Sequence, residues 1–103
     1  MIPALAVAIT LIQGGMVFGG LDSCATWLST SANENAGRHW ILGFWSGKNM
    51  EAALAGGRMG RVGESTDGAG IVGEVKLACQ AAPSKTLIAV TLETYERFKA
   101  ENR

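Results

Sequence analysis

The sequence predicts an all-α protein: a compact domain of four helices with one disulfide, preceded by an apolar N-terminal helix. No segment alternates apolar and polar residues with the period of two that a half-buried strand requires. Apolar residues instead recur at spacings of three and four along several stretches, as they do on one face of a helix. The chain has two cysteines, Cys24 and Cys79, from which a single bridge can form.

Length and charge narrow the class of protein. At 103 residues the chain is long enough for one small domain. Its formal net charge is +0, so it lacks the basic excess that nucleic-acid binding usually requires. Hydrophobic residues make up 48% of the chain, which argues against an intrinsically disordered protein.

Residues 1–20 are typical of a secretory signal peptide, which leaves residues 21–103 as the mature domain. An apolar run over residues 2–12 is followed by small residues over 14–20. A signal core precedes its cleavage site in this order, and a cut before Gly20 fits the pattern.

Two other interpretations of this segment remain open. The first basic residue is Arg38, so the positive charge that normally begins a signal is missing. Because about 20 residues can span a bilayer, the segment could be a retained anchor, and only then would the protein contact a membrane. It could also be a genuine part of the fold.

In an exported domain, an even pair of cysteines indicates a disulfide. Cys24 and Cys79 are 55 positions apart, and closing a loop of that length contributes about 4 kcal/mol in the chain-entropy model. The alternatives are two free buried thiols, or lipidation of Cys24 in a lipobox-like segment over 21–24. Lipidation would leave Cys79 unpaired.

The first helix is expected over 21–31, and the polar stretch 29–37 is expected to form a loop. Asp22 or Ser23 can cap the helix, because each side chain accepts hydrogen bonds from backbone N–H groups of the first turn. Residues at helical spacing share its apolar face, and they are Cys24, Trp27 and Leu28.

The second helix, expected over 36–55, is the centre of the predicted bundle. Its large apolar residues point in too many directions for a single stripe, so several neighbours should cover it. These residues are Trp40, Ile41, Leu42, Phe44 and Trp45. Gly43 and Gly47 each cost about 1 kcal/mol in a helix interior. Spaced by four, they should line a groove for a closely packed helix, on a side that Met50 and Leu54 continue.

The glycine-rich stretch 56–70 is expected to be a flexible or tightly turned loop. After it, Ser65 or Thr66 would cap a third helix that ends near Gln80. Asp67 would then lie at the N-terminus of this helix, where a negative charge is favourable.

A fourth helix is expected over 83–100, with Pro83 at its first position. Its apolar face should contain Leu87, Ile88, Thr91, Leu92, Tyr95 and Phe98. Glu93 and Arg97 are one turn apart and are expected to pair on the outside.

No pattern in the sequence predicts a catalytic residue, a metal site or a cofactor. His39 is the only histidine, whereas a metal needs several His, Cys or carboxylate ligands that converge. Residues 68–73 match G-x-G-x-x-G, but no predicted strand precedes them, so the dinucleotide fingerprint is absent. Residues 46–48 lack the first glycine and the spacer of a phosphate loop. The protein is therefore expected not to be an enzyme.

Binding to another protein is the function that remains. The expected contact surfaces are the loops at the two ends of the second helix, because functional contacts concentrate in loops. The candidate residues are Asn33, Glu34 and Asn35 at one end and Arg58, Arg61 and Glu64 at the other.

Four stretches, in this order, resemble the Rap1a/Tai family of small periplasmic immunity proteins. Residues 23–28 are similar to the family's CGTWL opening, and residues 40–49 to its W-x-x-G-Y-x-S-G-x-N, with Phe44 in the tyrosine place. Residues 66–70 resemble its T-D-x-x-G helix start. Residues 78–87 resemble its Y-C-x-x-N-P-x-x-x-L end, with alanines replacing the tyrosine and the asparagine.

The resemblance covers about residues 23–92 and implies a compact helical fold with one cysteine bridge. It makes a core motif of Trp27, Trp40, Gly43, Phe44, Trp45, Gly47 and Asn49. The implied function is periplasmic: binding and inhibiting a peptidoglycan amidase effector of a type VI secretion system, often as a homodimer. A distant likeness to acid-stress chaperones of the HdeA type gives a second hypothesis. A periplasmic interaction module without a toxin partner is the third.

Overall fold

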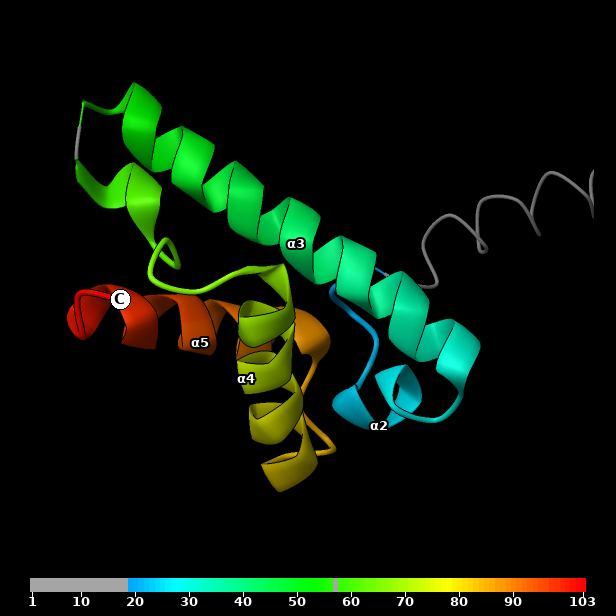
Figure 1. Cartoon of the computed structure of the whole chain (residues 1–103). Coiled ribbons are helices and arrows are strands. Elements are labelled where there is room, and N and C mark those ends of the chain that lie inside the picture. Colours follow the sequence, from blue (N-terminus) through cyan, green and yellow to red (C-terminus); the bar gives the residue numbers. More distant parts are fainter. Residues whose placement is uncertain (1–18, 57) are drawn as a thin grey trace, which may run out of the picture.

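The computed structural model describes residues 19–56 and 58–103, which form an all-α fold (Figure 1). The helices are α2 (Cys24–Trp27), α3 (Ser31–Leu54), the 3-10 helix η1 (Arg58–Arg61), α4 (Gly68–Ala81) and α5 (Leu87–Ala100). The predicted fold class is therefore confirmed. Of the predicted signal-like segment 1–20, residues 1–18 lie outside the described part of the chain.

Helix α3 is the longest element, and its 24 residues extend for about 36 Å. Figure 1 shows α2, α4 and α5 on one side of it. The predicted loop over 29–37 is wrong, because the helix already begins at Ser31. The Thr30 hydroxyl caps it by accepting the Asn33 N–H at 3.0 Å. The first turns are polar because they are largely exposed, and not because the backbone is irregular.

Helix α2 is much shorter than predicted because residues 20–25, here called the strap, run along the α4–α5 connection. Ser23 and Thr86 form an isolated antiparallel bridge at its centre. Four backbone N–H groups donate across it: Ile88 to Gly20 O (2.8 Å), Leu87 to Asp22 O (2.7 Å), Cys24 to Lys85 O (2.9 Å) and Ala25 to Pro83 O (3.0 Å). Ser23 is extended and pairs with Thr86, so α2 begins only at Cys24.

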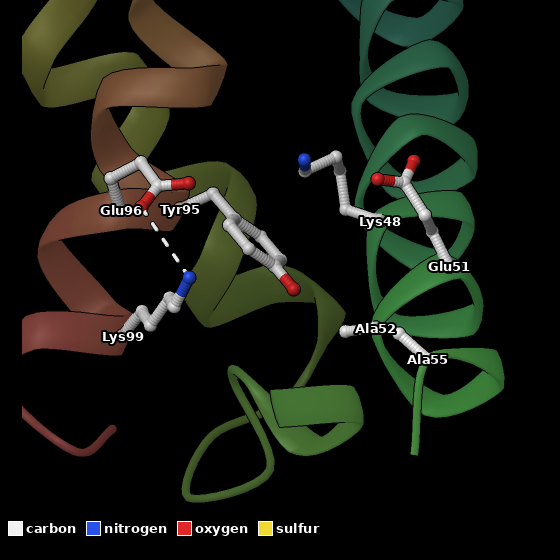
Figure 2. Close-up of a pocket in the computed structure, with 7 residues that line it drawn as sticks. All are labelled: Lys48, Glu51, Ala52, Ala55, Tyr95, Glu96 and Lys99. Atoms are coloured by element: carbon white, nitrogen blue, oxygen red, sulfur yellow. Dashed lines mark ion pairs between the residues drawn. The ribbon is translucent and has the colours of Figure 1, made fainter. Parts of the chain in front are cut away.

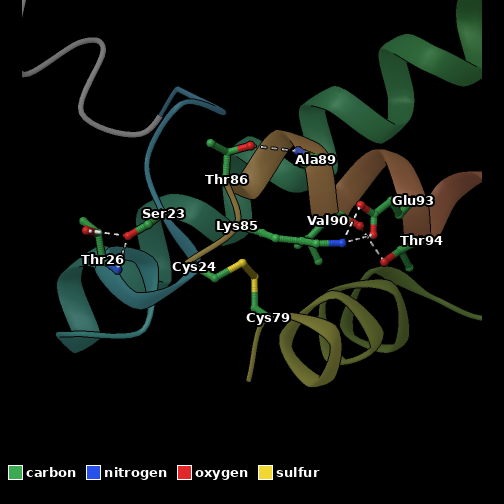
Figure 3. The surroundings of a disulfide bond; sticks show 10 residues. All are labelled: Ser23, Cys24, Thr26, Cys79, Lys85, Thr86, Ala89, Val90, Glu93 and Thr94. Atoms are coloured by element: carbon green, nitrogen blue, oxygen red, sulfur yellow. Dashed lines mark hydrogen bonds and ion pairs between the residues drawn. A yellow bond between two sulfur atoms is a disulfide. The ribbon is translucent and has the colours of Figure 1, made fainter. Parts of the chain in front are cut away.

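The strap also moves the start of α5 from the predicted Pro83 to Leu87. The residues just before Leu87 pair with the strap, and the Thr86 hydroxyl caps the helix by accepting the N–H of its third residue at 3.3 Å (Figure 3). The buried face contains Leu87, Val90, Thr91, Thr94, Tyr95 and Phe98. Ile88 and Leu92, which the spacing predicts on this face, are 37% and 38% exposed.

The ion pair predicted within α5 is also wrong, because both of its members contact other parts of the chain. Lys85 Nζ lies 3.0 Å from Glu93 Oε1, and Arg97 Nη1 lies 3.6 Å from Glu74 Oε1. The first pair connects α5 to the segment before it (Figure 3), and the second connects α5 to α4.

Helix α4 agrees more closely with its predicted range. Its cap is Asp67, whose carboxylate accepts the Gly70 N–H at 2.9 Å, rather than Ser65 or Thr66. Leu77 is 63% exposed, whereas Ile71, Val72 and Val75 of the same helix are buried.

The predicted disulfide between Cys24 and Cys79 is confirmed (Figure 3). It joins α2 to α4, and both cysteines are fully buried. Around it lies one apolar core, formed by Trp27, Ile41, Trp45, Val62, Ile71, Val72, Val75, Leu87, Val90, Tyr95 and Phe98.

Arg103 ties the segment after α5 to the loop before α4. Its backbone O accepts the Gly63 N–H at 3.2 Å and the Ser65 hydroxyl at 3.0 Å. Its guanidinium lies 4.0 Å from the centre of the Phe98 ring and 3.1 Å from Glu74 Oε1.

Candidate partner-binding surface

Residues 58–67, here called the η1 loop, carry three of the predicted partner residues and are held in place by Asn49 of α3. The Asn49 amide pairs with both backbone groups of Val62: Nδ2 donates to the Val62 O at 2.9 Å, and Oδ1 accepts the Val62 N–H at 3.2 Å. The same Oδ1 accepts the Tyr95 hydroxyl at 2.8 Å. One side chain therefore joins the η1 loop, α3 and α5.

Trp45 supports the same point of the η1 loop from within the core. Its Nε1 donates to the Val62 O at 2.8 Å, and its ring packs edge-on against Tyr95 and Phe98 at centroid distances of 5.0 and 5.2 Å. After Val62 the chain turns away through Gly63, whose φ of 91° favours glycine. The middle of the loop is thus part of the core, and its position is fixed.

The charged side chains of Arg61 and Glu64 in the η1 loop face solvent. Arg61 Nε lies 3.8 Å from Glu64 Oε2, and the two side chains are 78% and 61% exposed. A pair this exposed contributes little to stability, so both groups are available to a partner. The side chain of Arg58 lies outside the described part of the chain.

A shallow groove of about 380 Å³ lies between the η1 loop, α3 and the start of α4. It is lined by Leu42, Trp45, Ser46, Asn49, Ile71 and residues 60–64 and 66–68. Its lining combines an apolar surface with the charges of Arg61, Glu64 and Asp67. Such a combination suits a docking side chain of another protein, which buries apolar atoms and pairs its polar ones.

A second hollow, of about 280 Å³, lies between α3 and α5 (Figure 2). Its walls carry Lys48 and Glu51 from α3 and Glu96 and Lys99 from α5, and Tyr95 lies between them. Burial raises the pKa of Tyr95 above 10.0, and the nearby carboxylates of Glu96 and Glu51 raise it further. At neutral pH the hydroxyl is therefore protonated and serves as the donor to Asn49.

Comparison with known proteins finds no match. No family model fits the chain, and neither a curated protein nor a solved structure is significantly similar to it. The family resemblance of the sequence motifs remains a prediction.

The predicted surface near the start of α3 is helical and lies at the opposite end of α3 from the η1 loop. Two of its residues are engaged within the chain. Asn33 Nδ2 donates to the Thr26 O at 3.1 Å, and the Lys76 ammonium pairs with the Glu34 carboxylate. Asn35 is exposed. The two predicted surfaces are therefore not brought together.

The aromatic residues of the core motif are buried to different degrees. Trp27 is fully buried and Trp45 is 3% exposed. Trp40 and Phe44 stack at 5.2 Å between ring centroids, and both are half-buried at the surface of α3. The prediction of a helix covered on most sides therefore holds only for the Trp45 side.

Within residues 19–56 and 58–103, no helix packs against Gly43 and Gly47 as predicted. A Cβ at either glycine would meet no atom of these residues within 4 Å, and Met50 and Leu54 are 62% and 81% exposed. The close-packed glycine of α3 is Gly37, which the sequence analysis did not single out. Its Cβ would lie 2.2 Å from the indole ring of the buried Trp27.

Other functional groups are scattered over the described residues. His39 is exposed, and no three His, Cys, Asp or Glu side chains within residues 19–56 and 58–103 are close enough to hold a metal ion. No helix in the same two ranges is long and apolar enough to cross a membrane.

Proposed function

We propose that this chain is an exported protein-binding module whose contact surface is the η1 loop with its groove. The specific form of the proposal is an immunity protein of the Rap1a/Tai kind, which binds a peptidoglycan amidase effector of a type VI secretion system and covers its active site. The partner is a protein, and the chain itself needs no cofactor for this role.

The observation that carries the proposal is a charged loop whose backbone is fixed from beneath. Asn49 and Trp45 hold Val62, while Arg61 and Glu64 face solvent. A surface that is already ordered loses little conformational entropy on association, and this allows a small loop to bind tightly. A loop that keeps its shape is also suited to entering and blocking the cleft of an enzyme.

The residues of the family-like motifs have structural roles that are consistent with the resemblance. Cys24 and Cys79 form the bridge, and the Trp27 Nε1 donates to the Glu34 O at 2.9 Å. Asn49, the last residue of the W-x-x-G-Y-x-S-G-x-N-like stretch, anchors the η1 loop. One motif thus supplies Asn49, a support of the proposed surface, whereas Arg61 and Glu64 lie outside the motifs.

The test is a binding titration with the amidases encoded beside this gene. The charge swap Arg61→Glu with Glu64→Lys alters the proposed surface. As a matched control, Lys85→Glu with Glu93→Lys alters a second exposed ion pair, between α5 and the segment before it. We expect the first swap to raise Kd at least about tenfold and the control to leave it unchanged. The proposal fails if no amidase binds with nanomolar affinity or if both swaps weaken binding equally.

Ion pairs between helices favour a second candidate, an acid-activated chaperone. The Glu34 carboxylate pairs with Lys76 across α3 and α4, and Glu74 of α4 pairs with Arg97 of α5. Acid disrupts ion pairs of this kind, because their carboxylate partners lose their charge. The helices could loosen while the disulfide holds the chain together, and apolar surface would be exposed to bind unfolding proteins.

This candidate is tested by the aggregation of an acid-sensitive client enzyme with and without the protein. Protection at about pH 2.5 together with none at neutral pH would support it, as would exposure of apolar surface to a fluorescent dye over the same pH range. Equal client aggregation with and without the protein in acid would exclude it.

A further inference from the structure

The part of the η1 loop that follows Val62 has an anchor of its own, at the end of α5. The Gly63 N–H donates to the backbone O of Arg103 at 3.2 Å, and the Ser65 hydroxyl donates to the same O at 3.0 Å. In the part of the chain that the structure describes, the other backbone hydrogen bonds of this short segment are local turns. The exposed Glu64 lies between the two donors, so its position depends on this anchor.

A tight turn places Arg103 against the η1 loop (Figure 1). The Arg103 N–H donates to the Phe98 O at 2.8 Å, and the Asn102 N–H donates to the Lys99 O at 3.2 Å. These two bonds form a Schellman motif, which ends a helix and reverses the direction of the chain. The motif requires a left-handed residue, and Asn102 supplies it with a φ of 56°. Asparagine adopts this conformation more readily than most residues.

The side chain of Arg103 fixes the same turn from its other side. The guanidinium lies 4.0 Å from the centre of the fully buried Phe98 ring. Its Nη1 lies 3.1 Å from Glu74 Oε1 on α4 and 3.2 Å from Glu101 Oε1 at the end of α5. A guanidinium can make these contacts together, because it is planar, permanently charged and able to stack on an aromatic ring. Arg103 therefore connects the η1 loop to the core and to both helices.

We propose that Arg103 is a positioning residue of the partner-binding surface, which keeps the loop after Val62 in the shape that presents Glu64 to a protein partner. The inference rests on the proposed function for the partner, whereas the anchor itself can be tested without one. Because α3 holds only Val62, a loop without Arg103 would stay attached at its middle and move after it. A partner that requires the ordered shape would then bind only the fraction of molecules that have it.

Hydrogen exchange of two adjacent amides tests the anchor in the free protein. The Gly63 N–H donates to Arg103, and the Val62 N–H donates to Asn49, so each amide reports on a different anchor. In Arg103→Ala we expect the Gly63 amide to exchange at least about tenfold faster and the Val62 amide to exchange as before, because only local opening is affected. A general loss of stability would accelerate both.

Arg97→Ala is the matched control, because the Arg97 guanidinium pairs with the same Glu74 carboxylate at 3.6 Å. It should alter neither amide. Asn102 gives a second route to the anchor that leaves Arg103 itself unchanged. Asn102→Gly keeps the left-handed turn and should keep the Gly63 amide protected. Asn102→Val opposes a positive φ, and the same amide should then exchange faster.

Binding kinetics with an amidase encoded beside this gene distinguish positioning from direct contact. A positioning residue changes the population of the binding-competent loop. We therefore expect Arg103→Ala to lower kon at least about threefold and to leave koff unchanged. A higher koff with an unchanged kon would mean that Arg103 touches the amidase, which contradicts the positioning role.

The proposal is overturned if Arg103→Ala leaves the exchange of the Gly63 amide unchanged, or accelerates the Gly63 and Val62 amides equally. In the second case the residue would only stabilise the fold. Faster exchange at Gly63 alone, together with unaltered amidase binding, would support the anchor and refute the η1 loop as the contact surface. The proposed function and the anchor therefore fail by different results.

Discussion

Asn49 has the largest structural role of any single polar residue in the candidate site. Its amide pairs with the N–H and O of Val62 much as a neighbouring strand would, and it also accepts the Tyr95 hydroxyl. Removing such a residue leaves several partners without hydrogen bonds, and a buried polar group without a partner lowers the free energy of unfolding.

We predict that Asn49→Ala lowers the free energy of unfolding by roughly 3 kcal/mol. The Val62 N–H and the Tyr95 hydroxyl would lose their partner in a part-buried site. Urea denaturation of the oxidised protein measures the loss. Asn35→Ala is the control, because Asn35 is exposed on the same helix, and its effect should stay within about 0.5 kcal/mol. Similar losses in both variants would contradict the assigned role.

Tyr95 gives a prediction about pH. Burial, reinforced by Glu96 and Glu51, raises its pKa above 10.0, so the folded state holds this proton more tightly than the unfolded state does. The resulting stability is fully present below the unfolded pKa and is lost as pH rises through the folded value. Because Tyr95 is the only tyrosine, ultraviolet titration of tyrosinate reports on it alone.

The native protein should show a higher titration midpoint than the urea-unfolded chain. Tyr95→Phe should abolish the signal and the stability loss that accompanies it, and Glu96→Gln should lower the native midpoint. Identical midpoints in the folded and unfolded proteins would show that the hydroxyl is not shielded.

At the residue scale, sequence reasoning identified Asn49 as a motif position but did not show what it does. An asparagine in a helix, four residues after a tryptophan, is a weak signal of a buried polar group. Its partners Val62 and Tyr95 are 13 and 46 positions away, and only the tertiary fold brings them together. Cys24 and Cys79 were easier to predict, because two cysteines allow only one intramolecular pairing.

Among the elements, α3 contains three glycines in different surroundings. Gly37 touches the Trp27 ring, whereas a Cβ at Gly43 or Gly47 would meet no atom of the described residues within 4 Å. The sequence pattern draws attention to Gly43 and Gly47, because a spacing of four places both on one face of a helix. The role of Gly37 depends on how α2 folds back against α3, which no local pattern reveals.

We predict opposite effects for the same substitution along this helix. Gly37→Ala should lower the free energy of unfolding by at least about 2 kcal/mol, because the new methyl group overlaps the fully buried Trp27 ring. Gly47→Ala should raise it by up to about 1 kcal/mol, because alanine is the better helix former and has room. Urea denaturation compares the two variants, and a destabilising Gly47→Ala would show that other atoms occupy the space beside Gly47.

The bounds of a helix could be predicted well only where its local sequence and its tertiary contacts favour the same structure. Helix α4 has a cap, an apolar stripe and a clear end within its own sequence, and its range was nearly right. Pro83 is a good first residue for a helix, yet the segment from Pro83 to Thr86 pairs with the strap. That competition between helix and strap involves residues about sixty positions apart, so it is invisible to any local window.

At the scale of the whole molecule, the disulfide should be the largest single stabilising link. Its loop spans 55 residues, for which chain entropy gives about 4 kcal/mol. We predict that adding reductant lowers the free energy of unfolding, measured in urea, by about 4 kcal/mol. The variant Cys24→Ala with Cys79→Ala should be insensitive to reductant, and an equal response of both proteins would exclude the effect.

The strap also determines when the fold can form. It joins residues 20–25 to residues 83–88, so the first turn of the domain has no partner until most of the chain is present. Contacts between such distant residues form late, because a long loop must close first. A chain that emerges N-terminus first therefore stays open until its last helix arrives, which is the state that a translocation channel for unfolded chains accepts.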